Sequence, residues 1–307
     1  MGDWAVTAQG LTRRFGATTA VDDVDLRVPR GRIYGFLGRN GAGKTTVIRL
    51  LLGLIRPTAG RVTVLCAPVG TRRSGVTPWD RVGYLVEGPG LYSELTAREH
   101  LGVAARYRRL GAGSVSDALE QFGLGGDAGT KARALSLGSR QRLGLALALM
   151  HRPELVILDE PSNGLDPAGV VELRSLLRDL ADDGVTVFMS SHHIAEVARL
   201  ADRVGIIDHG RLVEELDADQ LRAVARRRLA LSFIDPPTAA RAAAVLLGAG
   251  LDAEVRGDSV TSADDRSVTQ PEGVATLLVE ARVPPRYLAI EQEDLEARFL
   301  RMTGTVP

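Results

Sequence analysis

Short apolar runs alternate with segments of helical spacing along residues 1–216. In the helical segments, apolar residues recur every three or four positions, whereas the short runs have the length of buried strands. This alternation is typical of an α/β domain with a mostly parallel sheet. The runs predict strands at Val24–Val28, Ile33–Leu37, Val62–Leu65, Val82–Val86, Leu155–Leu158, Val185–Met189 and Val204–Ile207. The helical spacing predicts helices at Thr45–Ile55, Ala97–Tyr107, Ser139–Met150, Val170–Asp182 and Ile194–Ala201.

A second, smaller module is expected over residues 217–307. Its predicted elements are a connecting helix at Asp217–Arg228, a strand at Leu229–Ile234, a helix at Thr238–Leu247, a loop rich in Gly, Ser and Asp at Gly257–Gly273, a second strand at Val274–Val283 and a closing helix at Glu293–Met302. We interpret the basic run that ends the connecting helix as a solvated helix end rather than a binding patch. The module has no motif that indicates a chemistry of its own, so we expect an accessory or dimerisation role.

Composition and charge narrow the class of protein. The chain has 307 residues, of which 45% are hydrophobic and 25% charged, as in an ordinary soluble globular protein. Lys plus Arg and Asp plus Glu both number 38, so the bulk charge indicates no polyanionic partner and we expect no nucleic-acid binding. The single Cys66 excludes an intrachain disulfide. Residues 1–10 do not have the pattern of a secretory signal, and the apolar stretch Leu143–Met150 is too short to span a bilayer, so we expect a cytosolic protein.

Residues 38–46, GRNGAGKTT, match a complete phosphate-binding loop. Glycines let the backbone bend so that its N–H groups converge on phosphate oxygens, and the loop lies between a predicted strand and a predicted helix N-terminus. Lys44 is expected to lie against the β- and γ-phosphates, and the Thr45 hydroxyl to bind Mg²⁺. The expected nucleotide contacts are Gly38, Asn40, Gly41, Gly43, Lys44, Thr45 and Thr46.

A second motif, LVILDE at residues 155–160, places two carboxylates directly after a predicted buried strand. Such a strand delivers Asp159 to the sheet edge near the phosphate loop, where it can hold Mg²⁺ through water. Glu160 follows and is expected to point at the γ-phosphate, where a general base activates the attacking water. The pair therefore predicts nucleotide hydrolysis.

A third motif, LSLGSRQR at residues 135–142, completes a pattern that resembles the ABC-type ATPases, whose signature is LSGGQ followed by a helix. Ser136 and Gly138 match that signature, whereas Leu137 and Ser139 stand where Gly and Gln are usual. The same form is similar to that of many bacterial exporter ATPases. A serine hydroxyl, a glycine that permits close backbone approach and a helix N-terminus all suit phosphate. The resemblance implies that this signature contacts the ATP held by the opposing subunit of a dimer.

The resemblance extends from residue 6 to about residue 216 and implies the fold as well. It implies an α/β, P-loop NTPase (ABC ATPase) domain with a RecA-like core and a helical subdomain. A small α+β C-terminal module would follow that domain.

Three further site residues are implied by the same resemblance. Asp166 ends SNGLD, which occupies the position of the D-loop that links the two ATP sites across the dimer. His192 aligns with the switch histidine that contacts the γ-phosphate, and we expect its neighbour His193 to point elsewhere because side chains alternate along a strand end. Phe15 matches the aromatic that stacks on adenine, with a core phenylalanine as the alternative interpretation.

Glu87 departs from the family pattern, which has Gln at this place in the Q-loop. A Gln side chain offers a neutral oxygen and an NH₂ donor, whereas an ionised Glu offers only acceptors and a charge. We expect Glu87 still to bind Mg²⁺ and to belong to the catalytic set. Glu at this place resembles the E-loop of ATPases that pump bacitracin or lantibiotics; neutral drift is the alternative interpretation.

The function that the resemblance implies is the ATP-hydrolysing subunit of a bacterial ABC exporter of drugs, antibiotics or peptides. ATP and Mg²⁺ would be its cofactors, and a separate integral-membrane permease its partner. Two copies, or this chain and a paralogous ATPase, would pair at the cytoplasmic face of the membrane. The segment EDLEARFLRMTG near the C-terminus is similar to the ending of drug- and antibiotic-exporter ATPases. Two alternatives stay open: a soluble ABC ATPase without a transport role, and an importer ATPase subunit.

Overall fold

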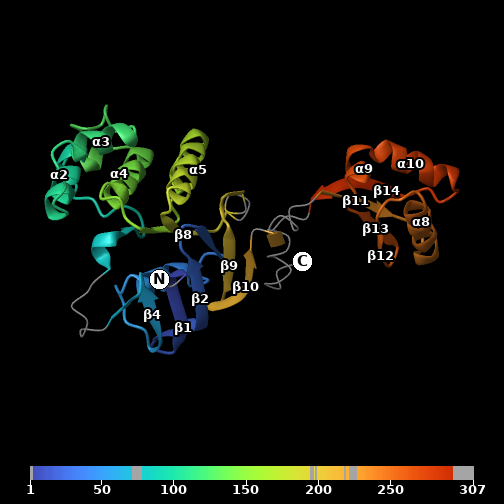
Figure 1. Ribbon diagram of the computed structural model, residues 1–307, viewed down its shortest axis with the longest axis horizontal. Coiled ribbons are helices and arrows are strands. Elements are labelled where there is room, and N and C mark those ends of the chain that lie inside the picture. The colour runs from blue at the N-terminus through green and yellow to red at the C-terminus, as the bar shows by residue number, and fades with distance from the viewer. Residues whose placement is uncertain are drawn as a thin grey trace. The chain divides into compact units, whose positions relative to one another are not determined.

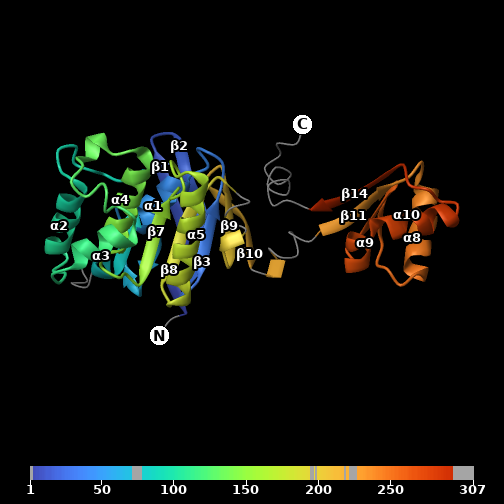
Figure 2. The same cartoon turned by 90° about the horizontal axis from the view of Figure 1, so that it is seen from above.

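The chain forms two compact units, Met1–Ala218 and Asp219–Pro307, in a computed structural model. The structure describes residues 3–70, 78–193, 197, 199–217, 219–220 and 227–292. Figures 1 and 2 show the elements of both units. The N-terminal unit has two sheets and the C-terminal unit has one, and each unit has its own buried core.

A six-stranded, mostly parallel sheet is the centre of the N-terminal unit, with strand order β10-β9-β3-β8-β7-β6. Its strands are β3 (Ile33–Leu37), β6 (Val82–Leu85), β7 (Leu155–Asp159), β8 (Thr186–Ser191), β9 (Arg203–Asp208) and β10 (Arg211–Asp217). Every residue of β3, β7 and β8 is buried. Parallel strands covered on both faces read as continuous apolar runs, and for this reason these three were recognisable in the sequence. The α/β fold class is confirmed.

The other described strands of this unit form an antiparallel sheet of order β2-β1-β4-β5. Its members are β1 (Trp4–Phe15), β2 (Thr18–Pro29), β4 (Ala59–Val64) and β5 (Ala67–Pro68). Besides the two-residue β5, the strands β1 and β10 were not predicted from the sequence. Both mix buried and exposed positions and carry polar residues along their length, so neither contains a long apolar run.

The helices of this unit are α1 (Lys44–Leu51), α2 (Ala97–Tyr107), α3 (Ser114–Gln121), α4 (Leu137–Leu149) and α5 (Pro167–Asp182). α2, α3 and α4 gather into a helical group, whereas α5 lies along the parallel sheet (Figures 1 and 2). α2 begins with a capping box made by Thr96 and Glu99. The mostly polar α3 was not predicted. The helix predicted at Ile194–Ala201 is described only at residues 197 and 199–201, of which 197, 199 and 200 are helical.

Helix α1 is the element that anchors the phosphate loop. It contacts the antiparallel sheet through β1, β2 and β4 and the parallel sheet through β7. Val47, Ile48 and Leu51 of α1 are fully buried in the core that these elements share. Burial of one such side chain stabilises a fold by about 1.5–3 kcal/mol. The packed helix therefore holds the end of the phosphate loop in place.

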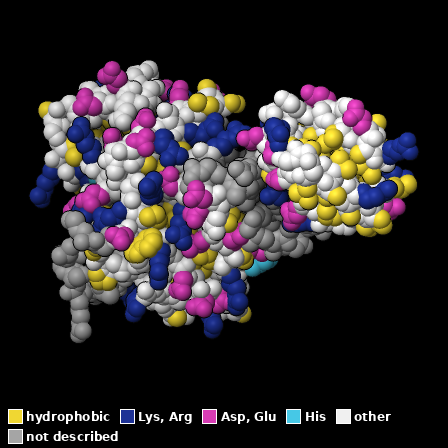
Figure 3. Space-filling view, turned by 45° about the vertical axis from the view of Figure 1, so that its right-hand side comes forward, with side chains coloured by type: hydrophobic (Ala, Val, Ile, Leu, Met, Phe, Trp, Pro, Cys, Tyr) yellow, Lys and Arg dark blue, Asp and Glu magenta, His cyan; other side chains and the backbone are white. Residues whose placement is uncertain are grey.

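The C-terminal unit has a four-stranded antiparallel sheet of order β12-β13-β11-β14. Its elements are β11 (Arg227–Ser232), α8 (Pro236–Gly248), β12 (Glu254–Arg256), β13 (Ser259–Ser262), α9 (Asp265–Thr269), α10 (Pro271–Glu280) and β14 (Tyr287–Gln292). A separate core that includes Phe233, Leu246 and Leu278 holds them together. Figure 3 shows hydrophobic side chains grouped on one face of this unit. Its exposed large apolar side chains include Ile234, Leu247 and Val279.

Several predictions for this unit were wrong. The segment Val274–Val283 is not a strand: it lies mostly in helix α10, whose first position is Pro271 and whose Val274 and Leu278 face the core at helical spacing. The predicted loop Gly257–Gly273 contains β13, α9 and the start of α10. Arg227 and Arg228, predicted to end a helix, lie in β11. The helix predicted at Glu293–Met302 lies outside the described residues.

Candidate functional site

The phosphate loop joins the end of β3 to the start of α1, as predicted. Two of its glycines are required sterically. A Cβ on Gly38 would lie 2.6 Å from the Ile207 carbonyl oxygen, and one on Gly43 would lie 2.6 Å from the Ala20 carbonyl oxygen. Gly43 also caps α1 with a φ of 108° and without a side-chain hydrogen bond. The first N–H groups of α1 are therefore available to an anion.

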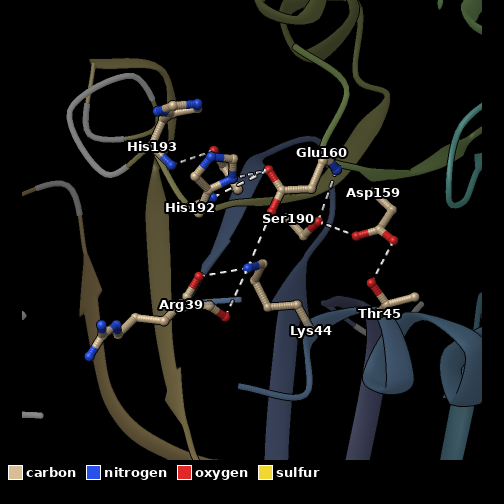
Figure 4. A network of polar contacts seen from close by, with 10 residues as sticks. Arg39, Lys44, Thr45, Asp159, Glu160, Ser190, His192 and His193 are labelled. Carbon is tan, nitrogen blue, oxygen red and sulfur yellow. Dashed lines mark hydrogen bonds and ion pairs between the residues drawn. The ribbon is translucent and has the colours of Figure 1, made fainter. Parts of the chain in front are cut away.

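Lys44 is buried, with 6% of its surface exposed, and its ammonium group lies inside the loop. Its Nζ donates to the carbonyl oxygens of Gly38 at 2.6 Å and Arg39 at 3.2 Å. The same Nζ lies 3.2 Å from Oε1 of Glu160 (Figure 4). The lysine therefore connects the phosphate loop to the acidic end of β7.

Asp159, the last residue of β7, contacts two hydroxyl groups (Figure 4). Thr45 Oγ1 donates to its Oδ2 at 2.8 Å, and Ser190 Oγ donates to its Oδ1 at 2.5 Å. The carboxylate is 5% exposed. A buried carboxylate whose partners in the described residues are neutral hydroxyls favours a cation beside it.

Glu160 has a left-handed backbone, with a φ of 49°. Its N–H donates to Ser190 Oγ at 3.0 Å, which fixes the turn after β7. His192 Nδ1 lies 2.8 Å from Oε2 of this carboxylate, on the opposite oxygen from Lys44. His193 instead donates its backbone N–H to Ser191 Oγ, and its ring packs on that of His192. Of the two histidines, His192 is the one that contacts Glu160.

This arrangement fits a nucleotide with Mg²⁺. The hydroxyl of Thr45 and the carboxylate of Asp159 supply the hard oxygen ligands that Mg²⁺ prefers, and the ion usually takes further ligands from substrate phosphates. The glycine backbone, the α1 N-terminus and Lys44 supply the groups that bind phosphate. In the same loop, Gly41 has a φ of 83° and a Cβ added to it would meet no atom within 4 Å, while Asn40 is exposed.

Glu87 follows β6 and is ion-paired with Arg49 of α1, with 2.5 Å between the guanidinium Nη2 and Oε2. Its side chain is 56% exposed. Sequence reasoning placed Glu87 next to Mg²⁺ and did not identify its partner Arg49. The spacing in α1 could have indicated Arg49. It lies four residues after Thr45, so it shares a helix face with the residue beside which Glu87 was expected.

The signature and the D-loop residues cap helices. Ser136 Oγ accepts a hydrogen bond from the N–H of Ser139 at 3.0 Å, so α4 begins at Leu137 rather than at the predicted Ser139. Asp166 caps α5 in the same way, through the N–H of Gly169. Gln141 Nε2 donates to the Pro161 carbonyl oxygen at 2.8 Å and ties α4 to the residue that precedes the D-loop. Gly138 lies in the first turn of α4, partly exposed.

Phe15 ends β1 with 46% of its surface exposed. The guanidinium of Arg13 lies 4.4 Å from the ring centroid. The ring is therefore not a core residue, and its stacking on adenine stays a prediction. Thr46 lies in the first turn of α1, partly buried.

Ser190 is a site residue that sequence reasoning missed. It contacts Asp159 and Glu160 together. The signal for it was the register of the sheet, in which Ser190 of β8 is the neighbour of Asp159 of β7. That register depends on strand pairing and is not visible in local sequence.

A cavity of about 620 Å³ lies beside Glu87, between the end of β6 and the helical group. Arg49, Glu87, Tyr107, Arg108 and His151 are among its lining residues. Burial lowers the pKa of the His151 imidazole, which favours its neutral form. The cavity presents aromatic, basic and acidic groups side by side.

Comparison with known proteins gives the family. The model of the ABC transporter family matches residues 21–163. The chain is 38% identical over 299 residues to the bacitracin transport ATP-binding protein BcrA of Bacillus licheniformis, covering 96% of this chain and 95% of the relative. It is 36% identical over 311 residues to the daunorubicin resistance ATP-binding protein DrrA3 of Streptomyces coeruleorubidus, covering 99% of this chain and 97% of the relative.

A solved structure also matches about two thirds of this chain. It is the dimeric, post-hydrolysis state of the ATP-binding cassette MJ0796 bound to ADP and phosphate. The match has a TM-score of 0.63 at 25% identity and covers 69% of this chain and 98% of the cassette. With the phosphate loop, the paired acids of β7 and the signature helix in one unit, this chain belongs to the ABC transporter family, as an ATP-hydrolysing subunit.

Proposed function

We propose that this ATPase drives the export of a drug-like or antibiotic compound through a separate membrane chain. The observation that carries the proposal is the similarity over nearly the whole chain to ATP-binding proteins named for bacitracin transport and daunorubicin resistance. No helix in the described ranges combines the length and the apolar run needed to cross a bilayer. Because those relatives are ATP-binding proteins of transport systems, we assign the path for the compound to a separate membrane chain and this chain to its cytoplasmic face.

Hydrolysis is assigned to the network around Glu160. Lys44 and the loop glycines bind the phosphates, and Phe15 stacks on adenine. Glu160 accepts the proton of the attacking water, while His192 orients the Glu160 carboxylate and contacts the γ-phosphate. Thr45 and Asp159 would hold Mg²⁺, which would supply positive charge to the phosphate oxygens, and we assign Glu87 to the same ion. ATP displaces the Lys44–Glu160 ion pair by offering phosphate oxygens to the lysine.

A dimer completes the site. Ser136 and Gly138 lie at the partly exposed N-terminus of α4, with an adjacent exposed Leu137. We assign them, with Asp166 of the D-loop, to the ATP held by a second subunit. The dimeric state of the similar cassette supports this assignment. The exposed apolar side chains of the C-terminal unit support a packing or dimerisation role for that unit.

We assign the contact with the membrane partner to the cavity of about 620 Å³ beside Glu87. Tyr84 and Tyr107, which line it, are 49% and 80% exposed. Exposed aromatic side chains with charged neighbours favour a protein partner. A segment of the permease seated there would contact the loop that carries Glu87.

ATP hydrolysis is tested by Glu160→Gln, which keeps the shape of the side chain and removes its basicity. Turnover should fall by about a hundredfold or more, the size of a general-base contribution, while ATP binding persists. Glu172→Gln is the matched control, because that carboxylate is 68% exposed on α5. Near-normal turnover of Glu160→Gln would remove this residue from the role.

The transport role is tested by purification from native membranes. A tagged copy should bring down a hydrophobic chain of about six spans. A soluble ATPase of the same family would bring down none. Resistance of cells that carry both chains to a toxic compound would then distinguish an exporter from an importer.

A further inference from the structure

Arg49 and Glu87 form an ion pair between the nucleotide core and the loop that leads to the helical group. Arg49 lies on α1, one helical turn after the metal-binding candidate Thr45. Its guanidinium Nη2 is 2.5 Å from Oε2 of Glu87. Both side chains line the cavity of about 620 Å³. The pair therefore links α1, the helix that follows the phosphate loop, to the cavity that the proposed function assigns to the permease.

The loop that carries Glu87 has an uncommon backbone. Glu87 has a φ of 55° and Gly88 a φ of 81°, so a non-glycine residue occupies the left-handed region. Such a conformation persists where the surroundings hold it. Arg49 holds the side chain from one direction. From the other, Pro89 packs so closely on α4 that a Cβ on Gly144 would lie 2.8 Å from the Pro89 Cβ.

We propose that Arg49 is a positioning residue that competes with Mg²⁺ for the Glu87 carboxylate. This inference rests on the proposed function. In the absence of nucleotide, the Arg49 guanidinium pairs with the Glu87 carboxylate and holds the loop towards α1. A divalent ion near Thr45 and Asp159 attracts the same carboxylate, so Glu87 turns to the metal only when the ion pair is given up or shared. Arg49 thereby makes movement of the loop conditional on bound Mg²⁺ and ATP.

The contact with α4 gives this competition a consequence. Because Pro89 packs on Gly144, a shift of the Glu87 loop presses on the helix that carries the signature. Arg49 thus determines how readily binding of the metal ion moves the Glu87 loop, and with it α4 and the lining of the cavity. An arginine at the last turn of α1 also favours that helix end, so the experiment must separate the two roles.

The first measurement is a Mg²⁺ titration of fluorescent ATP-analogue binding, in the Glu160→Gln background so that no turnover occurs. Arg49→Gln should raise the apparent Mg²⁺ affinity about twofold to fivefold, the range of an exposed ion pair. Combined with Glu87→Gln, the same substitution should change that affinity by less than about 1.5-fold, because the carboxylate for which Arg49 competes is gone. Arg49→Lys keeps the charge at the helix end and should fall between Arg49→Gln and wild type.

The second measurement follows the loop without metal or nucleotide. A nitroxide is attached to Gly90→Cys in the Cys66→Ser background, since a Cβ on Gly90 meets no atom within 4 Å. Arg49→Gln and Glu87→Gln should each make the label more mobile, and the double variant should add nothing further.

Two results would overturn the inference: equal Mg²⁺ affinity in wild type and Arg49→Gln, or an equal effect of Arg49→Gln with and without Glu87→Gln. The latter would leave Arg49 with a general charge effect on α1. If the wild-type chain binds no ATP analogue at any Mg²⁺ concentration, the proposed function fails as well. Nucleotide binding without coupling between the two residues removes only the role of Arg49.

Discussion

The Glu160 carboxylate lies between an ammonium group and an imidazole ring. Lys44 contacts one oxygen and His192 the other. Without nucleotide, the Lys44 ammonium group competes with a water molecule for this Glu160 oxygen. Phosphate oxygens that draw Lys44 away would free that oxygen at the moment when a base is needed. At the residue scale, we therefore propose that ATP binding activates Glu160 as the base.

Lys44→Ala tests the same connection from the binding side. It removes the charge that faces the phosphates and leaves the Glu160 carboxylate without its ion-pair partner. ATP affinity should fall about tenfold to a hundredfold, as expected for the loss of hydrogen bonds to charged groups. Equilibrium binding of a fluorescent ATP analogue measures it. Lys131→Ala serves as control, because Lys131 is 47% exposed and paired with Glu94. Unchanged affinity in Lys44→Ala would contradict the use of this loop for phosphate.

Glu87→Gln separates coupling from binding. The change preserves size and one oxygen acceptor while it removes the negative charge. ATP affinity should change by less than about 1 kcal/mol, the scale of one modest hydrogen bond. Resistance of cells to the transported compound should fall further than the ATPase activity of the isolated subunit. If both stay at wild-type levels, the glutamate is neutral drift.

At the scale of elements, the signature helix is fixed by close backbone packing. Gly83 of β6 has no room for a side chain, since a Cβ would lie 2.0 Å from the carbonyl oxygen of Ala148 on α4. Gly144 of the same helix is crowded by Pro89 and Leu85. These glycines let α4 approach the edge of the parallel sheet. The position of Ser136 at the start of α4 depends on that approach.

Gly83→Ala should therefore destabilise the N-terminal unit. The added methyl group must displace a backbone carbonyl, and overpacking of this kind costs about 1–3 kcal/mol. Urea unfolding followed by circular dichroism measures the loss. Gly90→Ala is the matched control, because its Cβ meets no atom within 4 Å. Equal stability of the two variants would mean that β6 and α4 adjust without cost.

At the scale of the whole molecule, we expect two chains to form a dimer when ATP is bound. Glu160→Gln with ATP should elute at about twice the monomer mass in size exclusion, since slow hydrolysis preserves a nucleotide-bridged pair. Ser136→Arg should abolish that shift by placing bulk and charge where close approach is required. Ser136→Thr keeps the hydroxyl that caps α4 and should retain the dimer. A monomer in every one of these samples counts against the shared site.

The sequence by itself determined the fold class of the N-terminal unit and the chemistry of its main motifs. The phosphate loop, LVILDE and the signature are local patterns in which a few adjacent residues carry both the backbone conformation and the reacting groups. The strands β3, β7 and β8 were visible because strands buried on both faces are continuously apolar. For these parts, neighbours along the chain decide the structure.

Tertiary structure alone decided the rest, because the deciding contacts join residues far apart in sequence. Ser190 reaches Asp159 and Glu160 only through the pairing of β7 with β8. The partner of Glu87 is Arg49, on a helix that is separated from it along the chain by β4, β5 and β6. In the C-terminal unit, α10 has apolar residues that fit a strand as well as a helix, and the core formed with α8 and the sheet selects the helix. Local patterns of this kind are ambiguous until burial against a distant surface distinguishes one conformation from the other.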